Sequence, residues 1–183
     1  MRAGEPLIGS FVKTPSHAVV EVMALAGFDF VVLDAEHAPF DRDALDRCLL
    51  AARAACLPAL VRLCDREPAT ALDALDLGAA GVLAPHVCSV DDARRVHAAC
   101  RYANGSRGFS NSPRAGDYGG IGMAELVARA DDQTAVLCQI EDREAVERVE
   151  DIATFDGIDC LFIGRADLAL SYGVFDPRER EVD

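Results

Sequence analysis

The sequence predicts an α/β fold built on a parallel β-sheet. Apolar runs of strand length recur along the chain, and each is followed by an amphipathic stretch of helical length. The runs are nearly continuous in aliphatic and β-branched residues, which is typical of strands that are buried on both faces. About six such β-α repeats with short links indicate parallel strands joined by right-handed crossovers.

Each element can be assigned to a segment of the chain. The expected strands, of which the first is the weakest, are residues 7–12, 28–33, 58–63, 81–84, 135–140 and 158–163. The expected helices have apolar residues three and four positions apart and cover residues 16–26, 41–55, 68–77, 90–101 and 142–153. Several of them open with an Asp or Ser of the N-cap type. Gly27 and Gly78 follow two helices directly, where a left-handed backbone costs glycine least.

Residues 102–122 interrupt the β-α alternation. This segment is rich in Gly, Ser and Asn, and it is too long for an ordinary link between a helix and a strand. Arg101, Arg107 and Arg114 lie in it or beside it. These cations could face an anionic substrate or a neighbouring subunit, or the segment could be a solvated surface loop.

The composition excludes several classes of function. The chain has 31 acidic and 18 basic residues and a net charge of −13, so we expect it to bind neither nucleic acid nor an anionic membrane. Its apolar runs are shorter than the roughly 20 residues of a membrane-spanning helix, and its start lacks a signal-peptide pattern. Seven cysteines without a C-x-x-C pair indicate reduced, packed side chains rather than disulfides or zinc. We therefore expect a cytoplasmic protein.

Two carboxylates follow the last two predicted strands, where parallel α/β folds place their active sites. Glu141 and Asp167 are 26 residues apart, about one βα unit, so they would project from neighbouring strands. Such a pair is half of a site for Mg²⁺ or Mn²⁺, with Co²⁺ as a possible substitute. A helix N-cap or a salt bridge is the alternative role for either carboxylate.

His37 is a candidate for proton transfer. It follows the predicted strand 28–33, and Asp34 and Glu36 are its acidic neighbours. Histidine titrates near neutral pH, and a carboxylate bound to one ring nitrogen would fix its tautomer and raise the basicity of the other nitrogen. The alternative is a loop histidine in solvent.

Arg62 and Asp76 are two further candidates. Arg62 lies within an apolar strand, where its burial is costly without an anion, so we expect it to meet a substrate anion or an oxyanion. Asp76 could cap a helix, form a structural ion pair or reach His37.

An ordered set of motifs covers nearly the whole chain: GFDFVVLDAEHAPFD, LVR, LDLGAAGVLAP, RYANGSRGF, QIE and FIGRADLALSYG. This set closely resembles the HpcH/HpaI aldolase family. These are divalent-metal-dependent class II aldolases that cleave 4-hydroxy-2-oxo acids, such as 4-hydroxy-2-oxoheptanedioate or 2-dehydro-3-deoxyglucarate, to pyruvate and an aldehyde. The resemblance implies a (β/α)8 TIM barrel, a homo-oligomer such as a hexamer, and a place in the catabolism of aromatic compounds or sugar acids.

The resemblance also implies a role for individual residues. Glu141 and Asp167 match the metal ligands, His37 the base acting through water, and Arg62 the residue that stabilises the transition state. Asp76 matches the carboxylate that raises the basicity of the base, and we expect Asp34 to take part in catalysis beside it. The expected substrate contacts are Gln139, Gly164, Ala166 through its backbone N–H, Asp167, and Phe11 on the aldehyde side.

The implied chemistry needs these parts. Pyruvate's methyl protons are weakly acidic, so a metal acting as a Lewis acid and the Arg62 guanidinium would hold the charge of the enolate. In the cleavage direction the base takes the proton of the 4-hydroxyl group, the C3–C4 bond breaks, and the enolate is reprotonated. No Schiff base is needed from Lys13, the one lysine of the chain.

The chain departs from the family pattern at two points. Arg165 stands where the family usually has proline, and it could alter the pyruvate pocket or contact a substrate carboxylate. The 183 residues form a single domain with about the first six βα units, whereas a closed barrel needs roughly 250 residues, so we expect a fragment of a longer product.

Three other functions remain as alternatives. A noncatalytic metal-binding barrel fragment would be credible if these residues were the whole protein. An acyl-CoA lyase of the malyl-CoA or citrate lyase β-like branch shares the barrel and the acidic pair, but that branch lacks the EHAP loop. A dinucleotide-binding oxidoreductase is disfavoured, because no G-x-G-x-x-G follows a strand.

Overall fold

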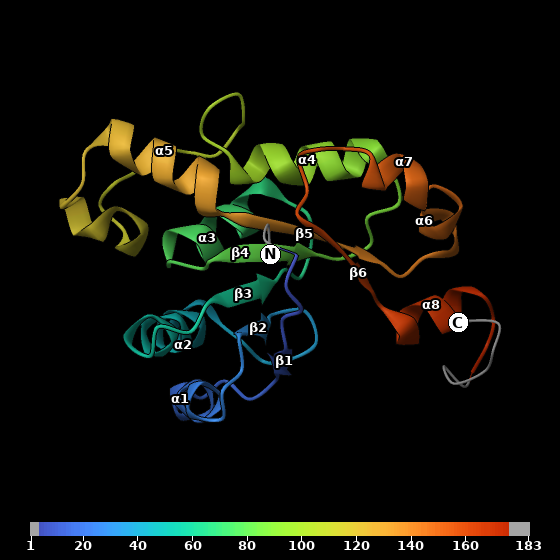
Figure 1. Ribbon diagram of the computed structural model, residues 1–183, viewed down its shortest axis with the longest axis horizontal. Coiled ribbons are helices and arrows are strands. Elements are labelled where there is room, and N and C mark those ends of the chain that lie inside the picture. The colour runs from blue at the N-terminus through green and yellow to red at the C-terminus, as the bar shows by residue number, and fades with distance from the viewer. Residues whose placement is uncertain (1–3, 176–183) are drawn as a thin grey trace.

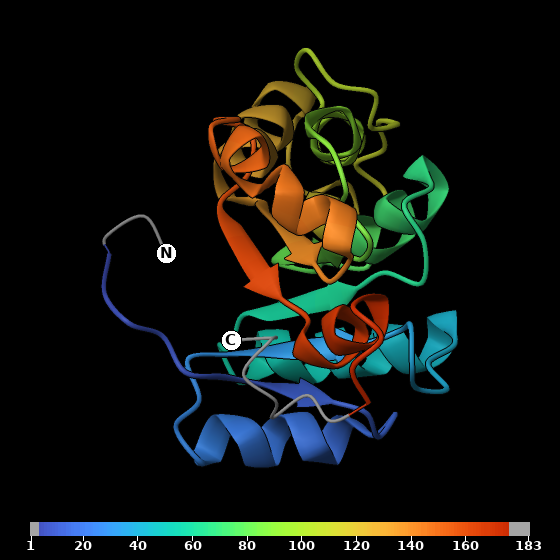
Figure 2. The ribbon, with the colours of Figure 1, turned by 90° about the vertical axis from the view of Figure 1, so that its right-hand side faces the viewer.

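The computed structural model describes residues 4–175 and confirms the α/β class. Six parallel strands form one sheet in the order β1-β2-β3-β4-β5-β6, so each strand pairs with the next one in the chain. The sheet curls into a half-barrel (Figures 1 and 2). This arrangement brings the carboxyl ends of all six strands to the same end of the half-barrel.

All six predicted strands form, and two of them have the predicted ends. The strands are β1 Gly9–Val12, β2 Phe30–Asp34, β3 Ala59–Arg62, β4 Gly81–Ala84, β5 Ala135–Ile140 and β6 Cys160–Ile163. β4 and β5 agree with the prediction residue for residue. The other four are shorter by one or more residues at their starts.

The helices follow the strands as expected, with two additions. They are α1 His17–Leu25, α2 Arg42–Ala54, α3 Pro68–Asp76, α4 Val90–Cys100, α5 Met123–Gln133, α6 Arg143–Glu147, α7 Val149–Ala153 and α8 Arg165–Ser171. The predicted helix over 142–153 is divided at Arg148, whose φ of −120° interrupts it. α5 and α8 were not predicted. None of the helices within residues 4–175 is long and apolar enough to cross a membrane.

Local signals explain several helix ends. The Asp41 side chain accepts a hydrogen bond from the Ala44 N–H at 2.8 Å, and the Ser89 hydroxyl accepts one from the Asp92 N–H at 3.1 Å. These bonds satisfy N–H groups that a first helical turn leaves free. Gly27 and Gly78 have φ values of 84° and 95°, which confirms the predicted left-handed ends of α1 and α3.

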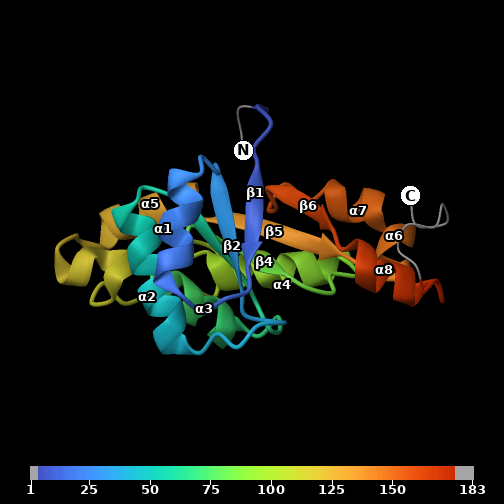
Figure 3. The same ribbon diagram turned by 90° about the horizontal axis from the view of Figure 1, so that it is seen from below.

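The strands divide the apolar residues between two cores. Val12, Leu33, Val61, Val82 and Cys138 face outward and pack under α1 to α4. The alternate residues face the inside of the half-barrel, where Val32, Leu60, Leu83 and Leu137 form a second core. Figure 3 shows α1 and α2 together on the outer side of β1 and β2. The division follows from the side-chain period of two along a strand.

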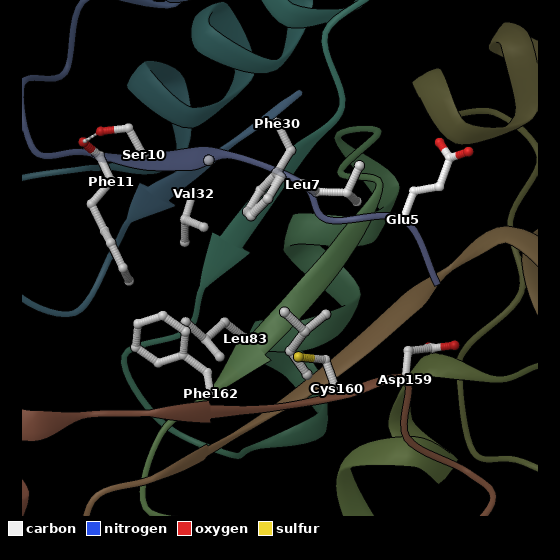
Figure 4. Close-up of a pocket in the computed structure, with 12 residues that line it drawn as sticks. Glu5, Leu7, Ser10, Phe11, Phe30, Val32, Leu83, Asp159, Cys160 and Phe162 are labelled. Carbon is white, nitrogen blue, oxygen red and sulfur yellow. Dashed lines mark hydrogen bonds between the residues drawn. The ribbon is translucent and has the colours of Figure 1, made fainter. Parts of the chain in front are cut away.

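The inside of the half-barrel holds a cavity of about 750 Å³. Phe11, Val32, Leu83 and Phe162 point into it (Figure 4). The rings of Phe11 and Phe162 meet edge to face with their centroids 5.6 Å apart, so side chains from the first and last strands are in contact across the cavity.

The long segment 102–122 folds back onto the protein. Arg101, Arg107 and Arg114 are all buried, with at most 8% of each residue exposed. Arg114 donates to the Leu77 carbonyl at 2.7 Å, and Arg107 pairs with Asp76 at 3.2 Å. The alternative of a solvated surface loop was therefore wrong for these arginines, because Arg107 and Arg114 tie the segment to the end of the sheet where the strands begin.

Candidate active site

The polar residues of the site come directly above the inner apolar core. Because side chains alternate along a strand, the residue two positions beyond an inward-facing one faces inward as well. Phe11, Val32, Leu60, Leu137 and Phe162 face inward. The residues two positions further along the chain are Lys13, Asp34, Arg62, Gln139 and Gly164. The strands therefore place a polar layer at their carboxyl ends.

Asp34 and Arg62 form the rigid centre of this layer. Arg62 Nε and Nη2 bind the two oxygens of Asp34 at 2.9 and 2.6 Å, and both residues are buried. Lys13 Nζ lies 3.3 Å from the same carboxylate. Burial alone would raise the pKa of Asp34, but the bonds from Arg62 and from the His37 N–H lower it to about 2. Arg62 thus has a protein carboxylate as its partner, and its contact with a substrate anion or oxyanion stays a prediction.

His37 lies at the mouth of the half-barrel with about half of its side chain exposed. Asp34 accepts from its backbone N–H at 3.0 Å and not from its ring. The ring nitrogen Nε2 lies 3.8 Å from Glu36 Oε2, so Glu36 is the carboxylate nearer to the imidazole. Burial raises the pKa of the Glu36 carboxyl, although the charges of Arg62 and His37 oppose this rise.

Glu141 is a carboxylate with 1% of its surface exposed. Its Oε1 accepts from the His86 N–H at 2.8 Å, and its Oε2 accepts from the Gln139 amide. Gly164 leaves room for it, because a Cβ at that position would lie 2.8 Å from Glu141 Cβ and Oε2. Gln139 Oε1 is buried without a hydrogen-bond donor among the described residues. The carboxylate is thus contacted by neutral donors at a place that has further oxygen atoms to offer.

His86 belongs to the site, although the sequence pointed to it only as a strand end. Its Nδ1 lies 2.9 Å from Asp142 Oδ2 and 3.5 Å from Glu141 Oε1, and its Nε2 lies 4.0 Å from Glu36 Oε1. Burial would lower the pKa of the ring, but the bond to Asp142 and the nearby carboxylates raise it. The signal that could have identified it is the Pro-His pair directly after strand 81–84, at the same end of the sheet as Arg62.

The remaining predicted residues are distributed over two regions. Asp167 and Ala166 lie in the first turn of α8, directly after Gly164. Phe11 lies beneath Arg62, with the guanidinium carbon 4.9 Å from its ring centroid.

Asp76 lies away from these residues. It ends α3 and pairs with Arg107, close to the start of β4. Within this chain the structure does not bring Asp76 to His37, and it shows the structural ion pair that was the alternative role for this residue.

The donor set suits a hard cation better than a soft one. Within residues 4–175, no three His, Cys, Asp or Glu side chains converge on a single point that could hold a metal. A cation would therefore depend on Glu141 and Asp167 together with oxygen atoms from water and substrate, which is typical of Mg²⁺ and Mn²⁺. The seven cysteines are free thiols and take no part in this set.

Comparisons with known proteins agree with the motif order. The family described as HpcH/HpaI aldolase/citrate lyase matches residues 7–182. A hydroxypyruvate/pyruvate aldolase from Sagittula stellata is 37% identical over 174 residues, which cover 94% of this chain and 68% of that protein. A 5-keto-4-deoxy-D-glucarate aldolase from Shigella boydii is 35% identical over 94% of this chain and 67% of its own length.

Solved structures show the same architecture. An HpcH/HpaI aldolase from Desulfitobacterium hafniense superposes with a TM-score of 0.92 at 28% identity, over 99% of this chain and 71% of that chain. The citrate synthase SbnG superposes with a TM-score of 0.88 at 30% identity, over 99% of this chain and 70% of its own.

Proposed function

This chain belongs to the HpcH/HpaI aldolase/citrate lyase family, and we propose that it cleaves a 4-hydroxy-2-oxo acid reversibly to pyruvate and an aldehyde. Its aldolase-named relatives place it among the carbon–carbon lyases. The observation that carries the proposal is the buried Glu141 carboxylate beside the Arg62–Asp34 pair, at the carboxyl end of the curled sheet. The curl of six parallel strands supports a (β/α)8 barrel as the fold on which this site is built.

Glu141 and Asp167 are the residues that would hold a divalent cation, Mg²⁺ or Mn²⁺, with Co²⁺ as a substitute. The fit rests on the chemistry of the donors: a buried carboxylate that neutral groups contact, and the Gln139 oxygen without a donor. Such a cation supplies Lewis-acid polarisation of the keto oxygen of a 2-oxo acid when it is bound.

Arg62 is proposed to stabilise the negative charge that develops on the keto oxygen. The bidentate pair with Asp34 fixes the plane of its guanidinium group, and Phe11 supports that plane from below. A donor that is held in place before the reaction costs no reorganisation during it. Asp34 is thus a positioning residue for Arg62.

His37 is proposed to be the base. Its half-exposed ring can accept the proton of the substrate's 4-hydroxyl group, and the Glu36 carboxylate lies 3.8 Å from its Nε2. The O–H electron pair then forms the aldehyde carbonyl, the C3–C4 bond breaks, and its electrons pass to the enolate. Protonation of the enolate at C3 completes pyruvate and balances the reaction.

Proton exchange of pyruvate tests the enolate half of this reaction. The full chain is mixed with pyruvate in D₂O, with and without Mg²⁺ or Mn²⁺, and deuterium entry into the methyl group is followed by NMR. We expect metal-dependent exchange that falls to the metal-free rate in Glu141→Gln. The matched control is Glu144→Gln, which removes an exposed carboxylate in α6 and should leave the rate unchanged. Exchange that ignores metal, or that survives Glu141→Gln, would refute the proposal.

Cleavage of a 4-hydroxy-2-oxo acid tests the role of the base separately. His37→Ala should suppress release of pyruvate, and unaffected turnover would remove His37 from the mechanism.

An acyl-CoA lyase is the second candidate, and the similarity to a citrate synthase is the observation that favours it. Malyl-CoA distinguishes the two, because an acyl-CoA lyase would cleave its carbon–carbon bond to acetyl-CoA and glyoxylate, whereas the aldolase should leave that bond intact.

A further inference from the structure

His86 has a backbone conformation that few residues other than glycine adopt. It follows Pro85 directly after β4, and its φ is 52°. This left-handed region is unfavourable for residues that carry a Cβ, and such conformations persist only where the surroundings enforce them. Other positive-φ residues with side chains occur in this chain, such as Asn104, so the contacts of residue 86 must show what the conformation does.

The contacts fix the backbone of His86 from both sides. Its N–H donates to Glu141 Oε1 at 2.8 Å. Its carbonyl accepts from the Arg66 guanidinium and lies 3.5 Å from Cys88 Sγ. The left-handed turn thus directs the N–H toward the buried carboxylate and the carbonyl toward a cationic side chain.

The bond from residue 86 completes the orientation of Glu141. Its Oε2 is occupied by the Gln139 amide and is packed against Gly164, so the His86 N–H is what holds the other oxygen. A carboxylate that is held at both oxygens presents its remaining lone pairs in one direction. Alteration of a group that holds a metal ligand in this way typically lowers metal affinity by about 10–100-fold.

The imidazole ring is attached to the rim of the site. Its Nδ1 binds Asp142 at 2.9 Å, and about half of the side chain is exposed. The same nitrogen lies 3.5 Å from Glu141 Oε1, so Asp142 is the closer partner of the ring, and the shorter contact of residue 86 with Glu141 is the backbone bond of 2.8 Å.

We propose that His86 is a positioning residue for Glu141, and that it acts through the backbone N–H that its left-handed conformation directs at Oε1. The inference rests on the proposed function, because it concerns the carboxylate that would bind the cation. The proposal assigns the orientation of Glu141 to the backbone N–H of residue 86 and not to the imidazole ring. Variants at position 86 should therefore bind Mn²⁺ more tightly the more readily the new residue adopts a positive φ.

The experiment measures Mn²⁺ affinity of the full chain without substrate, by the EPR signal of free Mn²⁺. Three variants remove the ring: His86→Asn, His86→Ala and His86→Val. Asparagine tolerates the left-handed region, alanine less so, and a β-branched valine least. We expect the dissociation constant to rise by less than about threefold for Asn, and by about 10–100-fold for Val, with Ala between them.

The controls separate the possible outcomes. His97→Val removes a histidine of α4 that packs on Phe155, and it should leave Mn²⁺ affinity unchanged. If His86→Val does not fold, the order of Asn and Ala still tests the inference. Equal weakening in all three variants would assign the effect to the ring and overturn the inference, as would three unchanged affinities. No Mn²⁺ binding by the unaltered chain would instead refute the proposed function itself.

Discussion

The two ends of the curled sheet both bury arginine, but they balance its charge differently. At the end where the strands begin, Arg107 pairs with Asp76 and Arg114 pairs with Asp46 at 2.8 Å. The Arg107 and Arg114 guanidinium groups thus each have a carboxylate of their own. This region closes the long segment 102–122 over the sheet and has the charge balance of a structural contact.

The carboxyl end has more acidic groups than cations. Arg62 pairs with Asp34 and lies 3.3 Å from Glu36, so two carboxylates share one guanidinium, and Glu141 is a further buried carboxylate at this end. Burying a carboxylate without a cation costs stability, because its solvation is lost and not replaced. A surplus of carboxylates over cations, and not the presence of a buried arginine, therefore distinguishes the carboxyl end from the end where the strands begin.

The largest effect is expected when one charge is removed at each end of the sheet and the two losses in the free energy of unfolding are compared. Arg107→Met leaves Asp76 without its partner and removes the stacking of the guanidinium on Tyr102, so we expect a loss of about 3 kcal/mol in the free energy of unfolding. Glu141→Gln should cost less, at most about 1 kcal/mol, because the hydrogen-bond donors to Glu141 are the neutral His86 N–H and Gln139 amide, and the His86 ring, 3.5 Å away, keeps Asp142 as its closer partner. Urea unfolding without divalent cations measures both.

The double variant Asp76→Asn/Arg107→Met is the control for this contrast. It removes both charges and should recover part of the stability lost in Arg107→Met. Equal losses for Arg107→Met and Glu141→Gln would show that the two ends do not differ in the way we infer.

The fold was predictable because its signals are local. Strands β4 and β5 could be located to the residue, since their aliphatic runs are bounded by polar or turn residues. Helix α5 was missed because the preceding glycine-rich segment hides its start, and no side chain caps its first turn. The interior position of Arg114 could not be predicted, because its partner Asp46 lies 68 residues away and belongs to a different βα unit.

The site was predictable in part for the same reason. Asp34, Arg62 and Glu141 follow strands at inward-facing positions, so the period of two places them together. The proposed role of His86 depends on its positive φ, and this backbone conformation cannot be inferred from the presence of a histidine at that position. The sequence left Asp76 open between a helix cap, a structural ion pair and a contact with His37, and the structure pairs it with Arg107, because the long segment packs against the end of α3.

Acid should weaken the pair at the carboxyl end. Asp34 has its pKa lowered from 3.8 to about 2, so its ionised form is bound more tightly in the folded chain than in the unfolded chain. The resulting stability, about 2 kcal/mol, is present above pH 4 and is lost as the pH falls from about 4 to about 2. Asp34→Asn should remove this part of the acid dependence in urea unfolding curves measured between pH 7 and pH 2. An unchanged acid dependence in that variant would show that Asp34 does not contribute it.

The smallest effect is expected at the exposed rim of the end where the strands begin. Arg53 lies 2.7 Å from Asp117, a shorter contact than that between Arg107 and Asp76, yet 55% of its side chain is exposed. Water and salt screen such a pair, and ordering the long side chain offsets much of the attraction. Arg53→Met should therefore cost at most about a fifth of what Arg107→Met costs, and the remaining cost should vanish in 0.5 M NaCl, a salt level at which the Debye length is about 4 Å. If urea unfolding shows equal losses for Arg53→Met and Arg107→Met, the distance between the paired atoms, and not burial, would set how much each arginine stabilises the chain. That result would refute the expected difference between the buried pair and the exposed pair.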